Sequence, residues 1–91
     1  MARGRKLVWP EWWVWELKMS PHMQERFPKR DFTEIELHRM MELVTNFRED
    51  RHEGRWIIDT RFRQNAWEVI VEPLADEMKL EIVTAYEVWN D

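Results

Sequence analysis

Residues 55–89 read RWIIDTRFRQNAWEVIVEPLADEMKLEIVTAYEVW, and this stretch decides the fold. Within it, residues 55–62, 66–73 and 80–89 form three runs that are strongly apolar or alternate between apolar and polar, as β-strands do. Two short polar segments join the runs: a hairpin loop at Gln64-Asn65-Ala66 and a turn at PLADEM. Consecutive strands with short connections pair antiparallel, so the sequence predicts a three-stranded antiparallel meander.

A helix is predicted before the meander. Thr33 and Glu36 form the capping-box pattern T-x-x-E, which marks the start of a helix. Apolar residues follow at spacings of three and four, as one face of a helix requires: Leu37, Met40, Met41, Val44 and Phe47. We therefore expect three to four helical turns that cover one face of the sheet, followed by the charged loop FREDRHEGR.

A further strand and a short helix are predicted towards the N-terminus. The segment EWWVWELKM, residues 11–19, places Trp13, Trp15, Leu17 and Met19 on one face of an alternating pattern, which is typical of a half-buried strand. Ser20 is then a suitable N-cap, and Pro21 suits the first helical position, where its missing N–H costs nothing. Pro28 ends or kinks the helix that follows.

The predicted element order is therefore β-α-α-β-β-β. A mostly antiparallel four-stranded sheet with two helices packed on one face is a two-layer α+β domain. A length of 91 residues fits one domain. We assign residues 11–91 to this domain and residues 1–10 to a basic flexible N-terminal tail.

The composition excludes several classes of site. The chain has no Cys, so it has no disulfide, thiolate metal site or Cys nucleophile. Its three His lack metal-ligand spacing, and its two Gly cannot form a phosphate-binding loop, so we expect neither a metal nor a cofactor. A net charge of −4 argues against a strong nucleic-acid binder. The acidic residues are concentrated in residues 68–91 and the arginines at 48–63, so a local basic patch can survive the acidic total. We expect no DNA partner. No apolar stretch reaches the ~18 residues that a membrane span needs, so we expect a cytoplasmic protein without membrane contact.

The first candidate for chemistry is a row of residues spaced by four. His22 and Arg26 share a helix face, and Arg30 follows at the same spacing beyond Pro28. Imidazole exchanges a proton near neutral pH, and a guanidinium group fits a phosphate. A solvated helix face gives the same pattern, so the spacing alone leaves both interpretations open.

The second candidate lies in the TRFR segment. Arg61 and Arg63 should point to the same face of a strand, where two guanidinium groups could hold a phosphodiester. The alternative is an ordinary exposed strand on which these arginines pair with Asp59 or Glu68 across the ladder. The sequence does not decide between the two.

The third candidate is at the end of the meander. Thr84 and Tyr86 share a face of the last strand, and Tyr86 is the only Tyr in a chain that otherwise uses Trp and Phe. Its hydroxyl is therefore a candidate for a functional role. The alternative is that the ring packs while the hydroxyl is hydrated.

Several of these residues also fall in a pattern that resembles a known family. H-x-x-x-R-x-x-x-R-x-[FI]-[ST]-E begins at His22, G-R-W begins at Gly54, and V-T-A-Y begins at Val83. Together they resemble a small bacterial and phage domain of unknown function related to RelE-like and BrnT-like toxins. These belong to the barnase–EndoU–colicin–RelE group of ribonuclease folds. The resemblance covers roughly residues 20–88, but Asp31 stands where the family usually has Gly, and Pro28 is unexpected.

The resemblance implies a toxin-like, metal-independent endoribonuclease that cleaves RNA by attack of a 2′-hydroxyl on the adjacent phosphate. It implies His22 as general acid or base, and Arg26 with Arg61 or Arg63 as the groups that stabilise charge on the phosphate. Tyr86 is then a second proton donor or a platform on which a base stacks. The substrate-binding residues that the resemblance implies are Arg30, Arg55 and Thr84. RNA and a cognate antitoxin protein are the implied partners.

A second hypothesis gives the same fold no catalytic role. An exposed edge strand rich in aromatic residues can pair with another chain. The Trp-rich segment at residues 11–19 would then bind a partner protein or form a homodimer. The sequence leaves this hypothesis and the ribonuclease hypothesis open.

Overall fold

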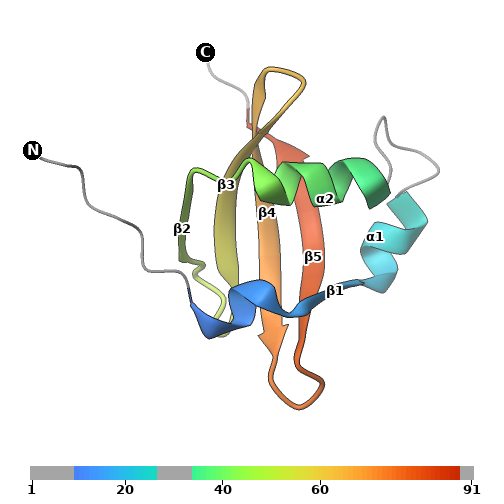
Figure 1. Ribbon diagram of the computed structural model, residues 1–91, viewed down its shortest axis with the longest axis vertical. Helices are drawn as coiled ribbons and strands as arrows, with labels where there is room; N and C mark the ends of the chain where they lie inside the picture. Colours follow the sequence, from blue (N-terminus) through green and yellow to red (C-terminus); the bar gives the residue numbers. More distant parts are fainter. Residues whose placement is uncertain (1–9, 27–33, 89–91) are drawn as a thin grey trace, which may run out of the picture.

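The chain forms a five-stranded sheet with one longer helix across one face. A computed structural model describes residues 10–26 and 34–88 (Figure 1). The elements are the 3₁₀ helix η1 (Glu11–Val14), strand β1 (Glu16–Met19), helices α1 (Pro21–Arg26) and α2 (Glu34–Glu42), and strands β2 (Asn46–Glu49), β3 (Trp56–Phe62), β4 (Asn65–Leu74) and β5 (Lys79–Glu87). The strand order is β1-β5-β4-β3-β2. Of the predicted basic tail, only Pro10 lies among the described residues.

The predicted four-stranded, mostly antiparallel sheet is wrong. The sheet is mixed, because β1 pairs parallel with β5, from Glu16 opposite Lys79 to Met19 opposite Ile82. β2 is an additional edge strand, antiparallel to β3. The antiparallel rule applies to strands joined by short connections, whereas α1 and α2 lie between β1 and the other strands.

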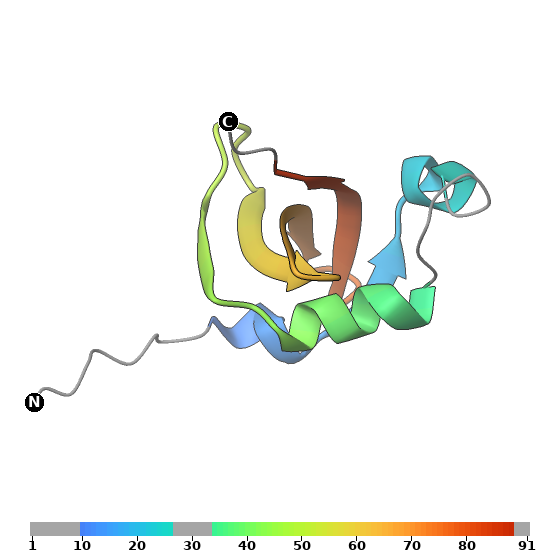
Figure 2. The same ribbon diagram turned by 90° about the horizontal axis from the view of Figure 1, so that it is seen from above.

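The predicted pair of helices packed on one face is also wrong. Among the described helices, only α2 is longer than six residues. Figure 2 shows α2 running across one face of the sheet, while the short α1 lies beyond β1 at the edge. The covering layer therefore consists mainly of α2 together with η1.

Only the second half of the predicted first strand is a strand. The N–H of Trp13 donates to the carbonyl of Pro10 at 3.0 Å, which closes a 3₁₀ turn in place of an extended start. This turn brings Trp12 against Phe47 and Trp56, with ring centroids 6.4 and 5.6 Å apart. Packing of large aromatic rings thus outweighs the local alternation of the sequence.

Helix α2 is shorter than predicted. Leu37 and Met40 are fully buried, as the spacing indicates, but the helix ends at Glu42 and Phe47 lies in β2. The hydroxyl of Thr60 on β3 donates to the carbonyl of Met40, so the last turn of α2 is bonded to the sheet. The capping residue predicted at position 33 lies outside the described residues.

The predicted meander is confirmed. β3 pairs antiparallel with β4, and β4 pairs antiparallel with β5. The first hairpin turns at Arg63 and Gln64, whose φ angles are 54° and 71°, one residue earlier than the predicted loop. Both residues adopt the left-handed conformation of a two-residue hairpin turn, although neither is glycine. A search for turns that contain Gly therefore does not find this hairpin.

Ser20 joins α1 to the sheet. It is buried, and its hydroxyl accepts the N–H of Met23 at 3.1 Å, as predicted for an N-cap. The same hydroxyl donates to the carbonyl of Val83 at 2.9 Å, and the N–H of Ser20 donates to the carbonyl of Ile82 at 3.1 Å. The pairing of β4 with β5 shifts at this point, because Val71 faces Ile82 while its neighbour Ile70 faces Thr84.

We predict that Ser20→Ala lowers the free energy of unfolding by about 1–3 kcal/mol, because both the helix cap and the bond to the sheet are lost. Urea unfolding followed by tryptophan fluorescence measures the change. Gln24→Ala is the control, since its exposed amide makes only a 3.4 Å contact to the carbonyl of Met19. Equal stability of Ser20→Ala and the wild type would contradict the anchoring role.

Candidate functional site

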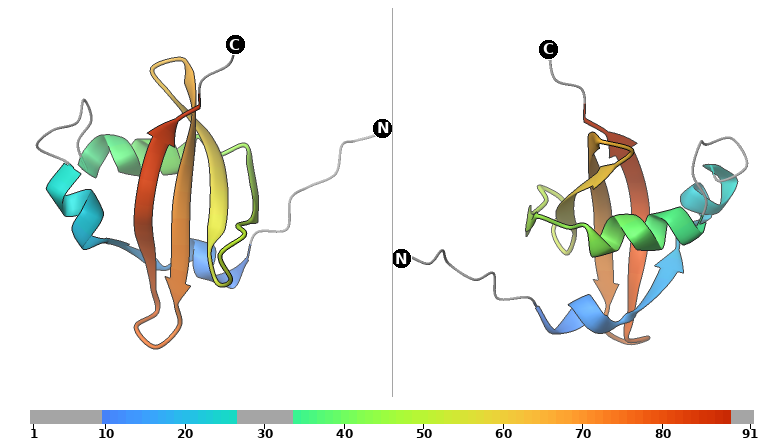
Figure 3. Two further views of the ribbon diagram at one scale, coloured as in Figure 1. Left: turned by 180° about the vertical axis from the view of Figure 1, so that it is seen from behind. Right: turned by 45° about the horizontal axis from the view of Figure 1, so that its top comes forward.

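The face of the sheet opposite α2 carries a row of polar residues across four strands. The register places Asn46 of β2, Asp59 of β3, Glu68 of β4 and Tyr86 of β5 directly beside one another. Figure 3 (left) shows β3, β4 and β5 from this side with no helix in front of them. We call this surface the open face.

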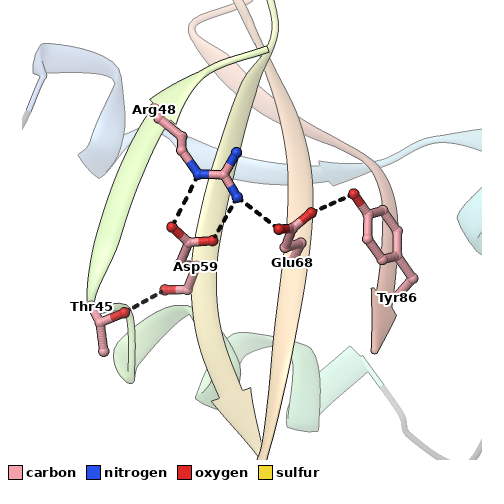
Figure 4. Close-up of polar contacts among 5 residues, drawn as sticks. All are labelled: Thr45, Arg48, Asp59, Glu68 and Tyr86. Carbon is pink, nitrogen blue, oxygen red and sulfur yellow. Dashed lines mark hydrogen bonds and ion pairs between the residues drawn. The ribbon is translucent and has the colours of Figure 1, made fainter. Parts of the chain in front are cut away.

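Arg48 of β2 connects this row. Its Nε donates to Oδ2 of Asp59 at 3.3 Å, and its Nη2 donates to Oδ1 of the same carboxylate at 3.1 Å. Nη2 also donates to Oε2 of Glu68 at 2.7 Å, so the guanidinium group reaches across β3 to β4 (Figure 4). The two carboxylates, Asp59 first, raise the pKa of Arg48 above its usual value.

Tyr86 completes the network from the other side. Its hydroxyl donates to Oε1 of Glu68, so Glu68 accepts from Tyr86 through one oxygen and from Arg48 through the other (Figure 4). The hydrogen bond to Glu68, followed by partial burial and the charge of this carboxylate, raises the pKa of Tyr86 to about 12. Tyr86 is nevertheless 41% exposed, so a molecule in solution can reach it.

The neighbouring row of the open face has two apolar residues at its centre, and the row beyond it is charged. Arg48 lies in a row with Ile57, Ile70 and Thr84, and Ile70 is only 7% exposed although it is not part of the main core. In the next row Nε of Arg55 donates to Glu72 at 3.1 Å. The network around Glu68 therefore lies beside a small apolar floor, with a second ion pair beyond it.

The structure separates the two arginines of the TRFR segment. Arg61 lies on β3 two residues from Asp59, hence on the open face, and its guanidinium group donates to the carbonyl of Gln64 at 3.3 Å. Arg63 lies in the hairpin turn and pairs with Glu36 of α2 at 3.4 Å. The expected placement of Arg61 and Arg63 on one strand face is therefore not observed.

The other predicted site residues are spread over several elements. His22 is exposed on α1, which contacts the edge of the sheet at β1 and β5. Arg26 ends α1, but its side chain is not described, and the predicted Arg30 lies outside the described residues. Thr84 and Arg55 lie near the network, Thr84 in the row of Arg48 and Arg55 in its ion pair with Glu72.

Sequence reasoning found Tyr86 but missed its partners Arg48, Asp59 and Glu68 as a site. Asp59 and Glu68 were considered only as ion-pair partners of Arg61 or Arg63, and the actual partner of both is Arg48. Arg48 was missed because it lies in a segment predicted as a loop, whereas β2 directs its side chain onto the open face. Extending the strand pairing to residues 46–49 could have found it.

Two of the hollows that the described residues form lie outside this network. One, of about 230 Å³, lies between the N-terminal segment and α2 and is lined by Trp13, Trp15, Leu17, His38, Met41 and Glu42. The other, of about 450 Å³, lies at the β2–β3 connection and is lined by Glu49, Asp50, Glu53, Gly54, Arg55 and Trp56. Within residues 10–26 and 34–88, no group of three or more His, Asp or Glu side chains is arranged to hold a metal ion.

Comparisons with protein-family models, curated proteins and solved structures gave no match to this chain. Among the helices that the structure describes, none combines the length and the apolar character needed to cross a membrane.

The chemistry available on the open face follows from these contacts. Glu68 offers a carboxylate proton acceptor, Arg48 offers a cation with several N–H donors, and Tyr86 offers a hydroxyl proton. In this structure no described residue accepts a hydrogen bond from Nη1 of Arg48. The arrangement can therefore move a proton beside a group that stabilises negative charge.

We predict that Tyr86 titrates near pH 12 in the folded protein and near pH 10 in the unfolded chain. Because folding raises this pKa, the stability from the neutral hydroxyl is fully present below pH 10 and is lost as the pH rises towards 12. Ultraviolet absorbance of the phenolate reports Tyr86 alone, since it is the only Tyr. Glu68→Gln should lower the midpoint towards 10, and a wild-type midpoint at 10 would contradict the hydrogen bond.

Proposed function

We propose that the chain is a toxin-like, metal-independent endoribonuclease domain whose reaction centre is the carboxylate of Glu68 on the open face. One observation carries this proposal: Glu68 lies between the guanidinium group of Arg48 and the hydroxyl of Tyr86, on a face that no described helix covers. A proton acceptor, a cation and a proton donor are the groups that phosphodiester cleavage without a metal requires.

The proposed reaction is an internal transfer at phosphorus. Glu68 takes the proton of a ribose 2′-hydroxyl, and the 2′-oxygen attacks the adjacent phosphorus. The bond from phosphorus to the 5′-oxygen of the next nucleotide breaks, and that oxygen takes the proton of Tyr86. The products are a 2′,3′-cyclic phosphate and a 5′-hydroxyl end. Proton transfer from Glu68 to Tyr86 through their hydrogen bond restores both groups.

Arg48 provides the electrostatic part of the proposal. Negative charge grows on the non-bridging phosphate oxygens as the 2′-oxygen attacks, and N–H donors fixed beside them stabilise that charge. The guanidinium group is held by Asp59 and Glu68, and its side chain is 46% exposed. The guanidinium group of Arg48 is therefore held in a fixed position on the open face that RNA can reach.

The resemblance of the sequence motifs to RelE-like and BrnT-like toxins is a second support for a ribonuclease, and it shares Tyr86 with this network. Within the proposal, Tyr86 has the first of the two roles that the resemblance implies for it, that of a proton donor. Glu68 takes the general-base role that the resemblance implies for His22, and Arg48 takes the charge-stabilising role that it implies for Arg61 or Arg63. His22 and Arg26 on α1 stay predictions from the sequence. A cognate antitoxin protein stays a proposed partner.

The experiment is cleavage of a labelled single-stranded RNA by purified protein. We predict that Glu68→Gln lowers the rate by at least about 100-fold, because a general base contributes that much or more. Arg48→Lys should lower the rate by about 100-fold, since an ammonium group cannot replace the guanidinium fork. A 2′,3′-cyclic phosphate and a 5′-hydroxyl at the product ends would identify the proposed mechanism. Because the proposed reaction uses no metal ion, a metal chelator should leave the cleavage rate unchanged.

The matched control is Glu81→Gln, which makes the same chemical change on another strand position, paired with Glu72. It should cleave at the wild-type rate. His22→Ala tests the role predicted from the sequence, and its failure to cleave would place the proton transfer at α1. Absence of cleavage by the wild type, both with and without ribosomes, would end the ribonuclease proposal.

The non-catalytic interaction module stays a prediction, but the structure changes its basis. The ring of Trp12 packs internally against Phe47 and Trp56, and β1 has only four residues. The Trp-rich segment therefore offers a partner chain a shorter edge strand and fewer exposed aromatic rings than the alternating sequence suggests.

A further inference from the structure

The guanidinium group of Arg48 has one edge that is already filled by an anion. Its Nε and Nη2 form the two-pronged donor that binds a planar carboxylate or two phosphate oxygens side by side. Oδ2 and Oδ1 of Asp59 occupy these two donors at 3.3 and 3.1 Å (Figure 4). A phosphodiester that binds through the same edge needs the same two N–H groups.

We propose that Asp59 is an internal competitor of the substrate: its carboxylate occupies the phosphate position on Arg48 and holds the site in a self-inhibited state. The inference rests on the proposed function, in which Arg48 binds the scissile phosphate. RNA engages the Nε–Nη2 edge of Arg48 only when it displaces the carboxylate of Asp59.

Displacement requires movement of side chains only. The backbone carbonyl of Asp59 accepts two hydrogen bonds from Thr45, one from its N–H at 2.9 Å and one from its hydroxyl at 3.3 Å. The backbone at Asp59 is therefore held independently of the carboxylate. The side chain of Asp59 is 29% exposed and that of Arg48 is 46% exposed. Ion pairs with this much solvent access contribute little to stability, so an incoming phosphate can compete for Arg48.

Glu68, unlike Asp59, does not occupy two N–H donors of the Arg48 guanidinium group. It contacts Nη2 through one oxygen, while its other oxygen accepts the hydroxyl of Tyr86. The alternative to competition is a positioning role for Asp59. In that role its carboxylate holds Arg48 in an orientation that directs Nη1 towards the phosphate. Removing the charge of Asp59 distinguishes these two roles. Loss of a competitor strengthens RNA binding, whereas loss of a positioning residue weakens it.

The test is Asp59→Asn, which keeps the size of the side chain and the backbone bonds to Thr45. Binding of a fluorescent 2′-O-methyl oligoribonucleotide, which lacks the attacking hydroxyl, is measured by anisotropy over a range of salt concentrations. We expect Asp59→Asn to bind about tenfold more tightly than the wild type, as for one added charge-assisted bidentate contact. The slope of log K against log salt should steepen by about 0.7 for one more phosphate contact on a single strand.

Glu81→Gln controls for the general loss of a negative charge on the open face and should change the affinity much less. Unchanged or weaker binding by Asp59→Asn, or equal tightening by Glu81→Gln, overturns the inference. If the wild type cleaves RNA and Asp59→Asn binds no more tightly, the ribonuclease proposal stands without the competitor. If Asp59→Asn binds more tightly and no variant cleaves, the anion site stands and the ribonuclease proposal fails.

Discussion

The alternation of β4 between two faces is the constraint on which the rest of the structure depends. Trp67, Val69 and Val71 are buried on the side of α2, which forces Glu68 to the opposite side. A register shift of one residue would exchange the two faces and bury the carboxylate of Glu68 in the core. Because β4 is paired on both sides, its pleat also sets the positions of Asp59 and Tyr86.

This register creates an electrostatic problem that Arg48 solves. Asp59 and Glu68 stand directly opposite each other on β3 and β4, and like charges in that position destabilise a sheet. The guanidinium group of Arg48 bonds to both carboxylates, so it reduces their repulsion. The N–H donors through which Arg48 stabilises the fold are thus the same donors that its proposed contribution to catalysis requires.

The parts of the fold that followed from the sequence are those with a local, repeated signal. The meander was predictable from long apolar runs, the cap at Ser20 from the Ser-Pro pair, and the buried helix face from Leu37 and Met40. β2 was missed because its four residues, NFRE, contain one apolar side chain and show no period. The parallel pairing of β1 was missed because it depends on where α1 and α2 carry the chain, which no local pattern encodes.

The candidate site was only partly predictable for the same reason. Tyr86 stands out in the composition, whereas Arg48 differs from the other arginines only through its place on an unpredicted edge strand.

The balance of charge in the network around Glu68 decides which molecules can bind beside Arg48. One guanidinium group, that of Arg48, faces the carboxylates of Asp59 and Glu68, so this network carries more negative than positive charge. These two carboxylates oppose the binding of a phosphate to Arg48 as long as both keep their places. In the proposed competition one carboxylate moves when a phosphate binds, and Glu68 is held from two sides by Arg48 and Tyr86. Asp59, whose carboxylate bonds only to Arg48 among the described residues, is the group that can give way.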